Sequence, residues 1–194
     1  WRWRGIRLMV TKTETTAIIT QAKTLQMSQP SVKRWLKHFF FMPAAKRYFS
    51  KQDQYEIAQA VQQAEQGHVG EIQVVIEGHI PATQAYQQNA HMRARQLFAE
   101  LGVWDTQLNS GVLLYLNLCE RKVEIVIDRG LQQATQQQVW DEICQKIVAD
   151  LAKQRFRVAV IDGVTEIGKV LNHFYSHSTD DLGNELPDSP ILLR

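Results

Sequence analysis

Residues 109–118 read Asn-Ser-Gly-Val-Leu-Leu-Tyr-Leu-Asn-Leu, residues 119–122 read Cys-Glu-Arg-Lys, and residues 123–131 read Val-Glu-Ile-Val-Ile-Asp-Arg-Gly-Leu. Two apolar runs of strand length flank four turn-compatible residues, and this pattern predicts a buried β-hairpin. Because hairpin strands are antiparallel, the polar residues before the first strand and after the second meet at one end of the sheet. We expect any site of the protein at that end.

Helical and strand patterns surround this hairpin. Residues 71–77 form another apolar run of strand length, and helical spacing of apolar residues predicts helices at 53–65, 84–101, 139–151 and 158–174. A helix joins the strand at 71–77 to the first hairpin strand, so these two strands should be parallel with a right-handed crossover. The sequence therefore predicts an α/β fold in which a mixed β-sheet, built from a β-α-β crossover plus the hairpin, is sandwiched by helices.

Capping residues support two of these helix starts. Ser50 and Asp53 are candidate caps of the helix at 53–65. Thr135 and Gln138 have the spacing of a capping box, which predicts that the third helix begins just after Thr135. The start of that helix would face the same end of the sheet as the polar hairpin residues.

Charge divides the chain unevenly. Residues 1–51 hold eleven Lys and Arg against one acid, whereas residues 52–194 hold eleven Lys and Arg against nineteen acids. We predict a basic N-terminal extension with an amphipathic helix at 1–51, an α/β domain at 52–175, and a polar tail at 176–194. The tail, with its Gly and Pro residues, should be an extended strap or disordered.

The basic extension contains one amphipathic segment, residues 31–49, which Pro43 interrupts. The residues that would contact a membrane or a partner are Lys33, Arg34, Trp35, Lys37, Lys46 and Arg47. One interpretation is docking on an anionic membrane surface. The plainer alternative is a helix that packs its aromatic side chains onto the domain and leaves its Lys and Arg in water. Ahead of it, residues 1–26 look poor for folding, and because Met27 lies inside the chain we expect them to be an upstream extension or a mistaken start.

Composition and motifs exclude several classes of protein. No apolar run reaches the ~18–20 residues that a membrane span needs, and the first residues lack the apolar core of a signal peptide. Cys119 and Cys144 have no metal-binding or CxxC spacing, which predicts free thiols in a reducing compartment. The chain contains no HExxH, Walker loop, GxGxxG or GxSxG motif. The expected location is cytoplasmic, with a peripheral position on the inner membrane as the variant that the basic extension suggests.

The predicted topology gathers polar residues at one end of the sheet. They are Glu71, Asn109, Ser110, Asp128, Arg129 and Gly130. Two carboxylates, an amide and a hydroxyl are oxygen ligands suited to a hard cation, whereas Arg129 and the following helix start would suit an anion. The plainer alternative is that Asn109 and Asp128 cap turns, and that Glu71 pairs with Arg93, Arg95 or Arg129.

Several short motifs, in the same order, resemble the TPM domain family, named after thylakoid lumen, photosystem II repair and membrane proteins. They are Gly-Glu-Ile at 70–72, Asn-Ser-Gly-Val-Leu-Leu-Tyr-Leu at 109–116, and Arg121, Val123, Ile125, Asp128, Gly130 and Leu131. The resemblance covers about residues 52–175 and is closer to a short bacterial branch without transmembrane helices. That branch has a basic N-terminal helix, a Trp in the helix after the hairpin and a closing Asn-Glu-Leu-Pro-Asp, which correspond here to residues 31–49, Trp140 and residues 184–188.

The resemblance implies an α/β sandwich, acid phosphatase activity and a divalent-cation site for Ca²⁺ or Mg²⁺. In this chain the candidate metal ligands are Asp128 and Asn109, which the predicted topology places at the same end of the sheet. The chain departs from the family pattern at both motifs. Asn109 and Ser110 stand where many members have Asp and Asn, and Asp128, Arg129 and Gln132 stand where many have Gly, Tyr and Glu. Two carboxylates are thus amides, which attract a cation far less.

Two functions of different classes follow as hypotheses. The first is a binding or assembly module, cytoplasmic or resting on the inner membrane surface, with an unidentified protein partner or an anionic membrane as its target. The second is a weak metal-assisted phosphatase that acts on phosphomonoesters. Nucleic-acid binding is not expected, because the domain that follows the basic extension is acidic.

Overall fold

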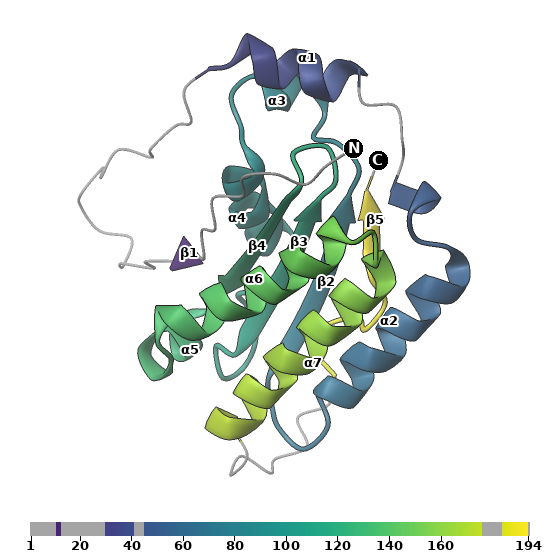
Figure 1. Ribbon diagram of the computed structural model, residues 1–194. Helices are drawn as coiled ribbons and strands as arrows, with labels where there is room; N and C mark the ends of the chain where they lie inside the picture. The colour runs from purple at the N-terminus through teal and green to yellow at the C-terminus, as the bar shows by residue number, and fades with distance from the viewer. Residues whose placement is uncertain (1–10, 13–29, 41–44, 176–183, 194) are drawn as a thin grey trace, which may run out of the picture.

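Five strands form one mixed sheet in the computed structural model, which describes residues 11–12, 30–40, 45–175 and 184–193. The strand order is β1-β4-β3-β2-β5, as Figure 1 shows. The strands are β1 (Thr11–Lys12), β2 (Glu71–Glu77), β3 (Gly111–Asn117), β4 (Lys122–Ile127) and β5 (Ile191–Leu193). The predicted hairpin is confirmed, because β3 and β4 pair antiparallel from Val112 opposite Ile127 to Asn117 opposite Lys122. The predicted parallel crossover is confirmed as well, with Glu71 opposite Gly111.

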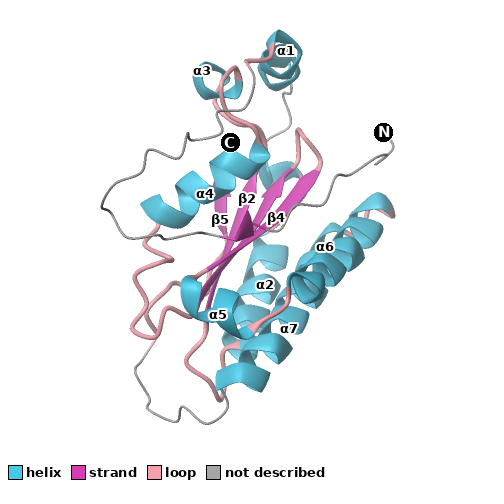
Figure 2. Ribbon diagram, turned by 90° about the vertical axis from the view of Figure 1, so that its left-hand side faces the viewer, coloured by secondary structure: helices cyan, strands magenta, loops and turns pink. Residues whose placement is uncertain are grey.

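Helices cover both faces of this sheet. They are α1 (Val32–Phe40), the 3₁₀ helix η1 (Ala45–Arg47), α2 (Lys51–Ala64), α3 (Ala82–Ala85), α4 (Ala90–Glu100), α5 (Arg129–Ala134), α6 (Gln137–Ala152) and α7 (Phe156–Tyr175). Figure 2 shows α2, α6 and α7 on one side of the strands and α4 on the other. The predicted α/β sandwich is therefore confirmed.

Alternation along the strands supplies two separate cores. Ile72, Val112 and Ile127 are among the side chains that point from the sheet toward α2, α6 and α7, and they belong to the larger buried cluster. Leu113 and Tyr115 point to the opposite face, where they pack with Ala94 and Phe98 of α4. Successive strand residues face opposite sides of a sheet, and burial of both sets explains why the hairpin reads as two nearly continuous apolar runs.

Helix starts agree with the sequence at α2 and differ at α6. Ser50 caps α2 and shares a capping box with Asp53, as expected. The predicted box at Thr135 is wrong, because Thr135 ends the unpredicted helix α5 and its hydroxyl donates to the Leu131 carbonyl (2.7 Å). The same hydroxyl accepts the indole N–H of buried Trp140 (2.8 Å), so it is already used when α6 begins.

The second predicted helix, 84–101, is two helices in the structure. Asn89 caps α4, and its side-chain oxygen accepts the Met92 N–H at 2.9 Å. The short helix α3 precedes this cap. Asn89 therefore ends one segment and starts the next, a role that the apolar spacing did not indicate.

Segments outside residues 52–175 also pack on the domain. Ala45 and Phe49 are buried in the larger core, and β5 of the tail pairs in parallel with β2. Residues 11–12 pair with the end of β4, where the sequence predicted no strand. The three-part division at 1–51, 52–175 and 176–194 stays a prediction, and Met27 and Pro43 lie outside the described residues. In the described part of the chain, every helix is too short or too polar to span a membrane.

Candidate functional site

Two ends of the sheet carry polar groups of interest. We call the first the start end, where β2 and β3 begin, β4 ends and α5 begins; it holds the six residues that the sequence singled out. We call the second the turn end, made of α1, the segment at 78–86 and the β3–β4 turn at 118–121. Figure 1 shows α1 and α5 at these opposite ends of the molecule.

Asp128 is the centre of the start end. It caps α5, and its Oδ1 accepts the Arg129 backbone N–H at 2.6 Å. Its Oδ2 is buried and accepts no hydrogen bond from the described residues. Burial raises the pKa of this carboxyl, although the Arg129 N–H and the Arg129 charge act in the opposite direction. Asp128 therefore caps a short helix, where the plainer alternative from the sequence expected a turn.

Arg129 and Asn109 join the two loops at this end. The Arg129 Nε donates to the Asn109 side-chain oxygen at 2.7 Å, and the Gly130 N–H donates to the Asn109 carbonyl at 3.2 Å. Asn109 has a left-handed backbone, with φ of 53°. A β-carbon on residue 130 would lie 2.6 Å from the Asn109 carbonyl oxygen and 2.9 Å from the Tyr175 hydroxyl. Close packing therefore requires the glycine of the Asp-Arg-Gly motif.

Ser110 and Gly111 have structural roles. The buried Ser110 hydroxyl donates to the Val69 carbonyl at 2.7 Å, and the Ser110 N–H donates to the Thr106 hydroxyl at 2.9 Å. A β-carbon on residue 111 would lie 1.9 Å from the Val103 carbonyl oxygen. The Asn-Ser-Gly motif therefore fixes how the chain begins β3.

Glu71 does not join this group. Its carboxylate accepts the backbone N–H groups of Glu185 and Leu186, each at 3.2 Å, so it holds the tail against β2. The predicted ion pair with Arg93 is wrong, because Arg93 pairs with Glu77 at 3.0 Å. Among the described residues, no hydrogen bond or ion pair links Glu71 with Asn109, Asp128 or Arg129.

The start end does not fit a hard cation. Ca²⁺ and Mg²⁺ need about six or more oxygen ligands. The Asn109 oxygen is used by the Arg129 guanidinium, Ser110 donates to a carbonyl, and Glu71 binds tail amides. In the described part of the chain, no group of three or more His, Cys, Asp or Glu could hold a metal ion. Asp128 Oδ2 is the oxygen of this set without a hydrogen-bond partner among the described residues, so a cation here would have one carboxylate and would depend on water for most of its ligands.

Two features of this end were missed in the sequence. Tyr175, at the end of α7, has its hydroxyl near Gly130, and its pKa is raised by burial and then by the Asp128 charge. Glu65 accepts the Ile72 N–H at 2.8 Å and lies by Asp188, and burial chiefly raises its pKa to about 8. The closing Asn-Glu-Leu-Pro-Asp motif at 184–188 was the sequence signal for a role of the tail. In the structure, the backbone N–H groups of Glu185 and Leu186 in this motif bind Glu71 at the start of β2.

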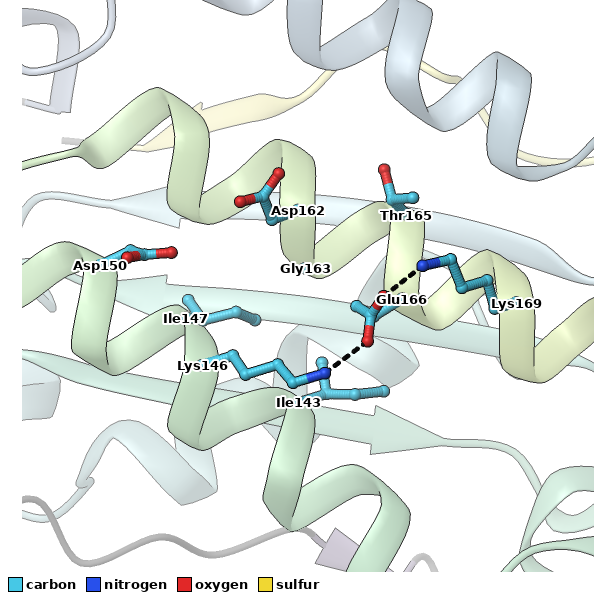
Figure 3. A pocket seen from close by; sticks show the side chains of 9 residues that line it. All are labelled: Ile143, Lys146, Ile147, Asp150, Asp162, Gly163, Thr165, Glu166 and Lys169. Carbon is cyan, nitrogen blue, oxygen red and sulfur yellow. Dashed lines mark hydrogen bonds and ion pairs between the residues drawn. The ribbon is translucent and has the colours of Figure 1, made fainter.

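A hollow of a different kind lies in the groove between α6 and α7. One part of it has a volume of about 290 Å³ and is drawn in Figure 3. Glu166 lies at its centre and accepts from Lys146 and Lys169, each at 2.6 Å. These three side chains project from exposed helix surfaces and neutralise one another in part, so they form a surface ion-pair cluster of small energetic weight.

At the turn end, α1 is attached to the domain through polar side chains. The Arg34 guanidinium donates to the carbonyls of Ala85 (2.7 Å) and Tyr86 (2.9 Å). His38 is 1% exposed, and its Nδ1 accepts the Ile80 N–H at 3.1 Å. The proton of the neutral ring therefore lies on Nε2, which is 3.2 Å from the Glu120 carboxylate.

Glu120 completes this attachment. It also pairs with Lys122 at 3.3 Å. Burial alone would raise the pKa of Glu120, but the bond from His38 and the charge of Lys122 outweigh it and the pKa is lowered. The Cys119 thiol donates to the Lys37 carbonyl, and burial raises its pKa to about 12, so this thiol is unreactive.

The opposite side of α1 is apolar and exposed. The exposed fractions are 58% for Val32, 41% for Leu36, 56% for Phe39 and 70% for Phe40. Trp35 is half-buried and stacks on Phe39 with ring centroids 5.3 Å apart. The expectation that the segment at 31–49 packs its aromatic side chains onto the domain is therefore wrong for Phe39 and Phe40 of α1, although it holds for Phe49, which is buried in the core. Arg34 and His38 supply the docking contacts instead, because backbone groups at 80–86 provide partners for them.

The basic residues predicted to contact a membrane divide into two sets. Lys33 and Lys37 are exposed on α1 beside the apolar side, and Lys46 and Arg47 are exposed on η1. Arg34 instead donates to the carbonyls of Ala85 and Tyr86 and holds α1 on the domain.

The TPM domain profile matches residues 44–170, which is more than half of the sequence. The chain belongs to the TPM domain family. Comparison of its sequence with curated proteins gave no significant match. The NMR structure of the BA42 protein from the psychrophilic bacterium Bizionia argentinensis is similar, with a TM-score of 0.65 and 24% identity over 74% of this chain and 94% of that one.

A second TPM-like fold is the N-terminal domain of a protein from P. gingivalis, solved by NMR. It has a TM-score of 0.55 and 19% identity, over 65% of this chain and 78% of that domain. Both identities are low, so these two structures support the fold of the TPM domain and leave its activity open.

Proposed function

We propose that this TPM-domain protein is a binding module that docks on an anionic membrane surface through α1, at the inner face of the cytoplasmic membrane. The observation that carries the proposal is the exposed apolar side of α1, formed by Val32, Leu36, Phe39 and Phe40. A soluble domain buries its large apolar residues where it can, so an exposed contiguous set suggests an interaction surface.

The arrangement of α1 suits the interface of a bilayer. Val32, Leu36, Phe39 and Phe40 follow the i, i+4, i+7, i+8 spacing of one helix face. Lys33 and Lys37 are exposed on the same helix, and residues 1–51 together carry ten more positive than negative charges. Interfacial helices combine such an apolar side with Lys near anionic headgroups.

The docking contacts favour this use of the helix. Arg34 and His38 hold α1 from its polar side, which keeps the apolar side chains directed away from the domain. A helix already formed and oriented loses less conformational freedom on binding than a disordered segment does. The nine residues of α1 are few, so we expect weak and reversible attachment.

Vesicle binding by the intact chain tests the proposal. We expect co-sedimentation with vesicles of phosphatidylcholine and phosphatidylglycerol and much less with phosphatidylcholine alone. The double variant Phe39→Ser/Phe40→Ser should lose about 2 kcal/mol of binding free energy, a roughly thirtyfold drop in partitioning. A matched control is Val139→Ser/Phe174→Ser, which removes two exposed apolar side chains from α6 and α7 and should bind normally.

Charge is tested separately. Each Lys near an anionic surface contributes about 1 kcal/mol, so Lys33→Gln/Lys37→Gln should weaken binding to anionic vesicles roughly thirtyfold and make the remainder less salt-dependent. Equal binding of the wild type to neutral and anionic vesicles would contradict the proposal. So would a self-association, lost in Phe39→Ser/Phe40→Ser, without any vesicle binding, because α1 would then be a protein interface.

The alternative is the weak metal-assisted phosphatase. The buried Oδ2 of Asp128, which has no hydrogen-bond partner among the described residues, is the observation in its favour. The Asn109 oxygen already accepts from Arg129 and the Ser110 hydroxyl donates to the Val69 carbonyl, and both contacts weigh against a metal site there. Hydrolysis of a generic phosphomonoester in the presence of Mg²⁺ should be equal, and at background level, for the wild type and Asp128→Asn. A rate that Asp128→Asn abolishes would support the phosphatase.

A further inference from the structure

We propose that the Arg129 guanidinium takes the place of a divalent cation at the start end, so that the two loops there are joined without metal. This inference concerns the start end and is independent of membrane docking by α1. The sequence gathers oxygen-bearing side chains suited to a hard cation, and the structure engages Asn109, Ser110 and Glu71 in protein contacts and leaves Asp128 Oδ2 without a hydrogen-bond partner among the described residues.

Arg129 makes the side-chain link that a bridging ion would make. Its Nε lies 2.7 Å from the Asn109 oxygen, which belongs to the loop before β3, while its backbone N–H is bound by Asp128 after β4. Two backbone bonds run in parallel with this link: Asp128 N–H to the Gly111 carbonyl (3.0 Å) and Gly130 N–H to the Asn109 carbonyl (3.2 Å). The loops are therefore fastened from both sides by protein groups.

Charge at this position also disfavours a cation. Asp128 is the carboxylate of the group, and the positive charge of Arg129 on the adjacent residue balances it. Asn109 contributes an uncharged amide oxygen that already accepts from the guanidinium. A divalent ion at the Asn109 oxygen would be repelled by the guanidinium and would have to displace it.

Local backbone geometry fits a permanent protein link. Asn109 adopts a left-handed conformation, with φ of 53°, which turns both its carbonyl and its side chain toward α5. The absence of a β-carbon at Gly130 lets α5 approach the Asn109 carbonyl, as the 2.6 Å clash distance shows. Arg129 is thus brought to Asn109 by the same close approach that the glycine permits.

Thermal unfolding of the intact chain tests this assignment. The midpoint of the wild type should be the same in CaCl₂, in MgCl₂ and in EDTA, because a ligand that binds only the folded state would raise it. Arg129→Gln should lower the midpoint without metal, and Arg129→Lys should lower it less. The double variant Asn109→Asp/Arg129→Gln should gain a rise of the midpoint with CaCl₂ that EDTA reverses.

Three outcomes would overturn the inference. The first is a rise of the wild-type midpoint with either metal that Asp128→Asn abolishes. The second is an Arg129→Gln midpoint equal to that of the wild type in EDTA. The third is an Asn109→Asp/Arg129→Gln protein that folds and ignores metal, since the guanidinium would then not be what excludes the ion. None of these outcomes affects vesicle binding, so the two proposals fail separately.

Discussion

The two ends of the sheet treat their side chains in opposite ways. At the start end, Asn109, Ser110 and Glu71 look available in the sequence and are engaged with protein atoms in the structure. At the turn end, one interpretation of the sequence buries Phe39 and Phe40, but both are exposed in the structure. Arg34 and His38 make the contacts with the domain instead. Polar residues at turns commonly form hydrogen bonds within the protein itself. The exposed apolar side chains of α1 are therefore the more informative sign of an interaction surface.

The difference has a physical origin. Backbone N–H and C=O groups at loop ends need partners when they are buried, and short polar side chains nearby are the cheapest ones. At the start end, the side chains of Ser110, Glu71 and Asp128 bind backbone groups in this way. At the turn end, backbone groups of the loop at 78–86 are the partners of α1. Arg34 donates to two carbonyls of this loop, and His38 accepts one of its N–H groups.

The largest expected effect comes from breaking the start end. Gly111→Ala would place a β-carbon 1.9 Å from the Val103 carbonyl oxygen, and relieving that overlap requires a backbone shift. We expect a loss of more than about 3 kcal/mol in the free energy of unfolding, measured by chemical denaturation. Gly67→Ala is the matched control: φ is 86° but no atom lies within 4 Å, so about 1–2 kcal/mol is expected. Equal losses would mean that close packing at β3 is unimportant.

A smaller effect is expected when the attachment of α1 is broken. His38→Ala removes the acceptor of the Ile80 N–H and the partner of Glu120, at a cost of about 1–3 kcal/mol. Amide hydrogen exchange in α1 should speed up roughly tenfold or more, while anionic vesicles are still bound because the apolar side is intact. Phe40→Ala is the control, since its side chain is 70% exposed, and should leave exchange in α1 unchanged. Unchanged exchange in His38→Ala would show that α1 is held by other contacts.

The sequence predicted the frame of the fold and little of its chemistry. The hairpin and β2 were predictable because both faces of the sheet are buried and the apolar runs are continuous. The six-residue helix α5 was not predicted, because it is too short for a periodic pattern. Thr135 was wrongly predicted to cap α6, because its hydroxyl accepts the indole N–H of Trp140. Amphipathic spacing predicted α1 but could not say which side of it meets the domain.

The remaining wrong predictions concern side chains whose partners are backbone groups far away in the chain. The groups that bind Glu71 lie at 185 and 186, and those that bind Arg34 lie at 85 and 86. Backbone groups carry no residue-specific signal in the sequence, so such contacts become visible only once the chain is folded. The closing Asn-Glu-Leu-Pro-Asp was recognisable as a motif, yet its role as a strap depends on these same contacts.

The effect that separates the two ends by pH concerns Glu65. Its pKa is raised by burial to about 8 in the folded protein, above the value of 4.5 for an exposed Glu. Between these values the folded state binds the proton more tightly than the unfolded state. The contribution of Glu65 to the free energy of unfolding is therefore fully present below pH 4.5 and is lost as the pH rises toward 8. Glu65→Gln keeps an oxygen for the Ile72 N–H and does not ionise, so its thermal midpoint should change less over this range.

The matched comparison lies at the turn end, where the pKa of Glu120 is lowered by His38 and Lys122 despite burial. A carboxyl with a lowered pKa stabilises the fold above its unfolded pKa and loses that contribution as the pH falls. Glu120→Gln should therefore cost stability at neutral pH and little in acid, opposite in sign to Glu65→Gln. Thermal midpoints of the wild type and both variants at a series of pH values give the two differences directly. If the two variants shifted the profile in the same direction, the assignment of opposite electrostatic roles to the two ends would be wrong.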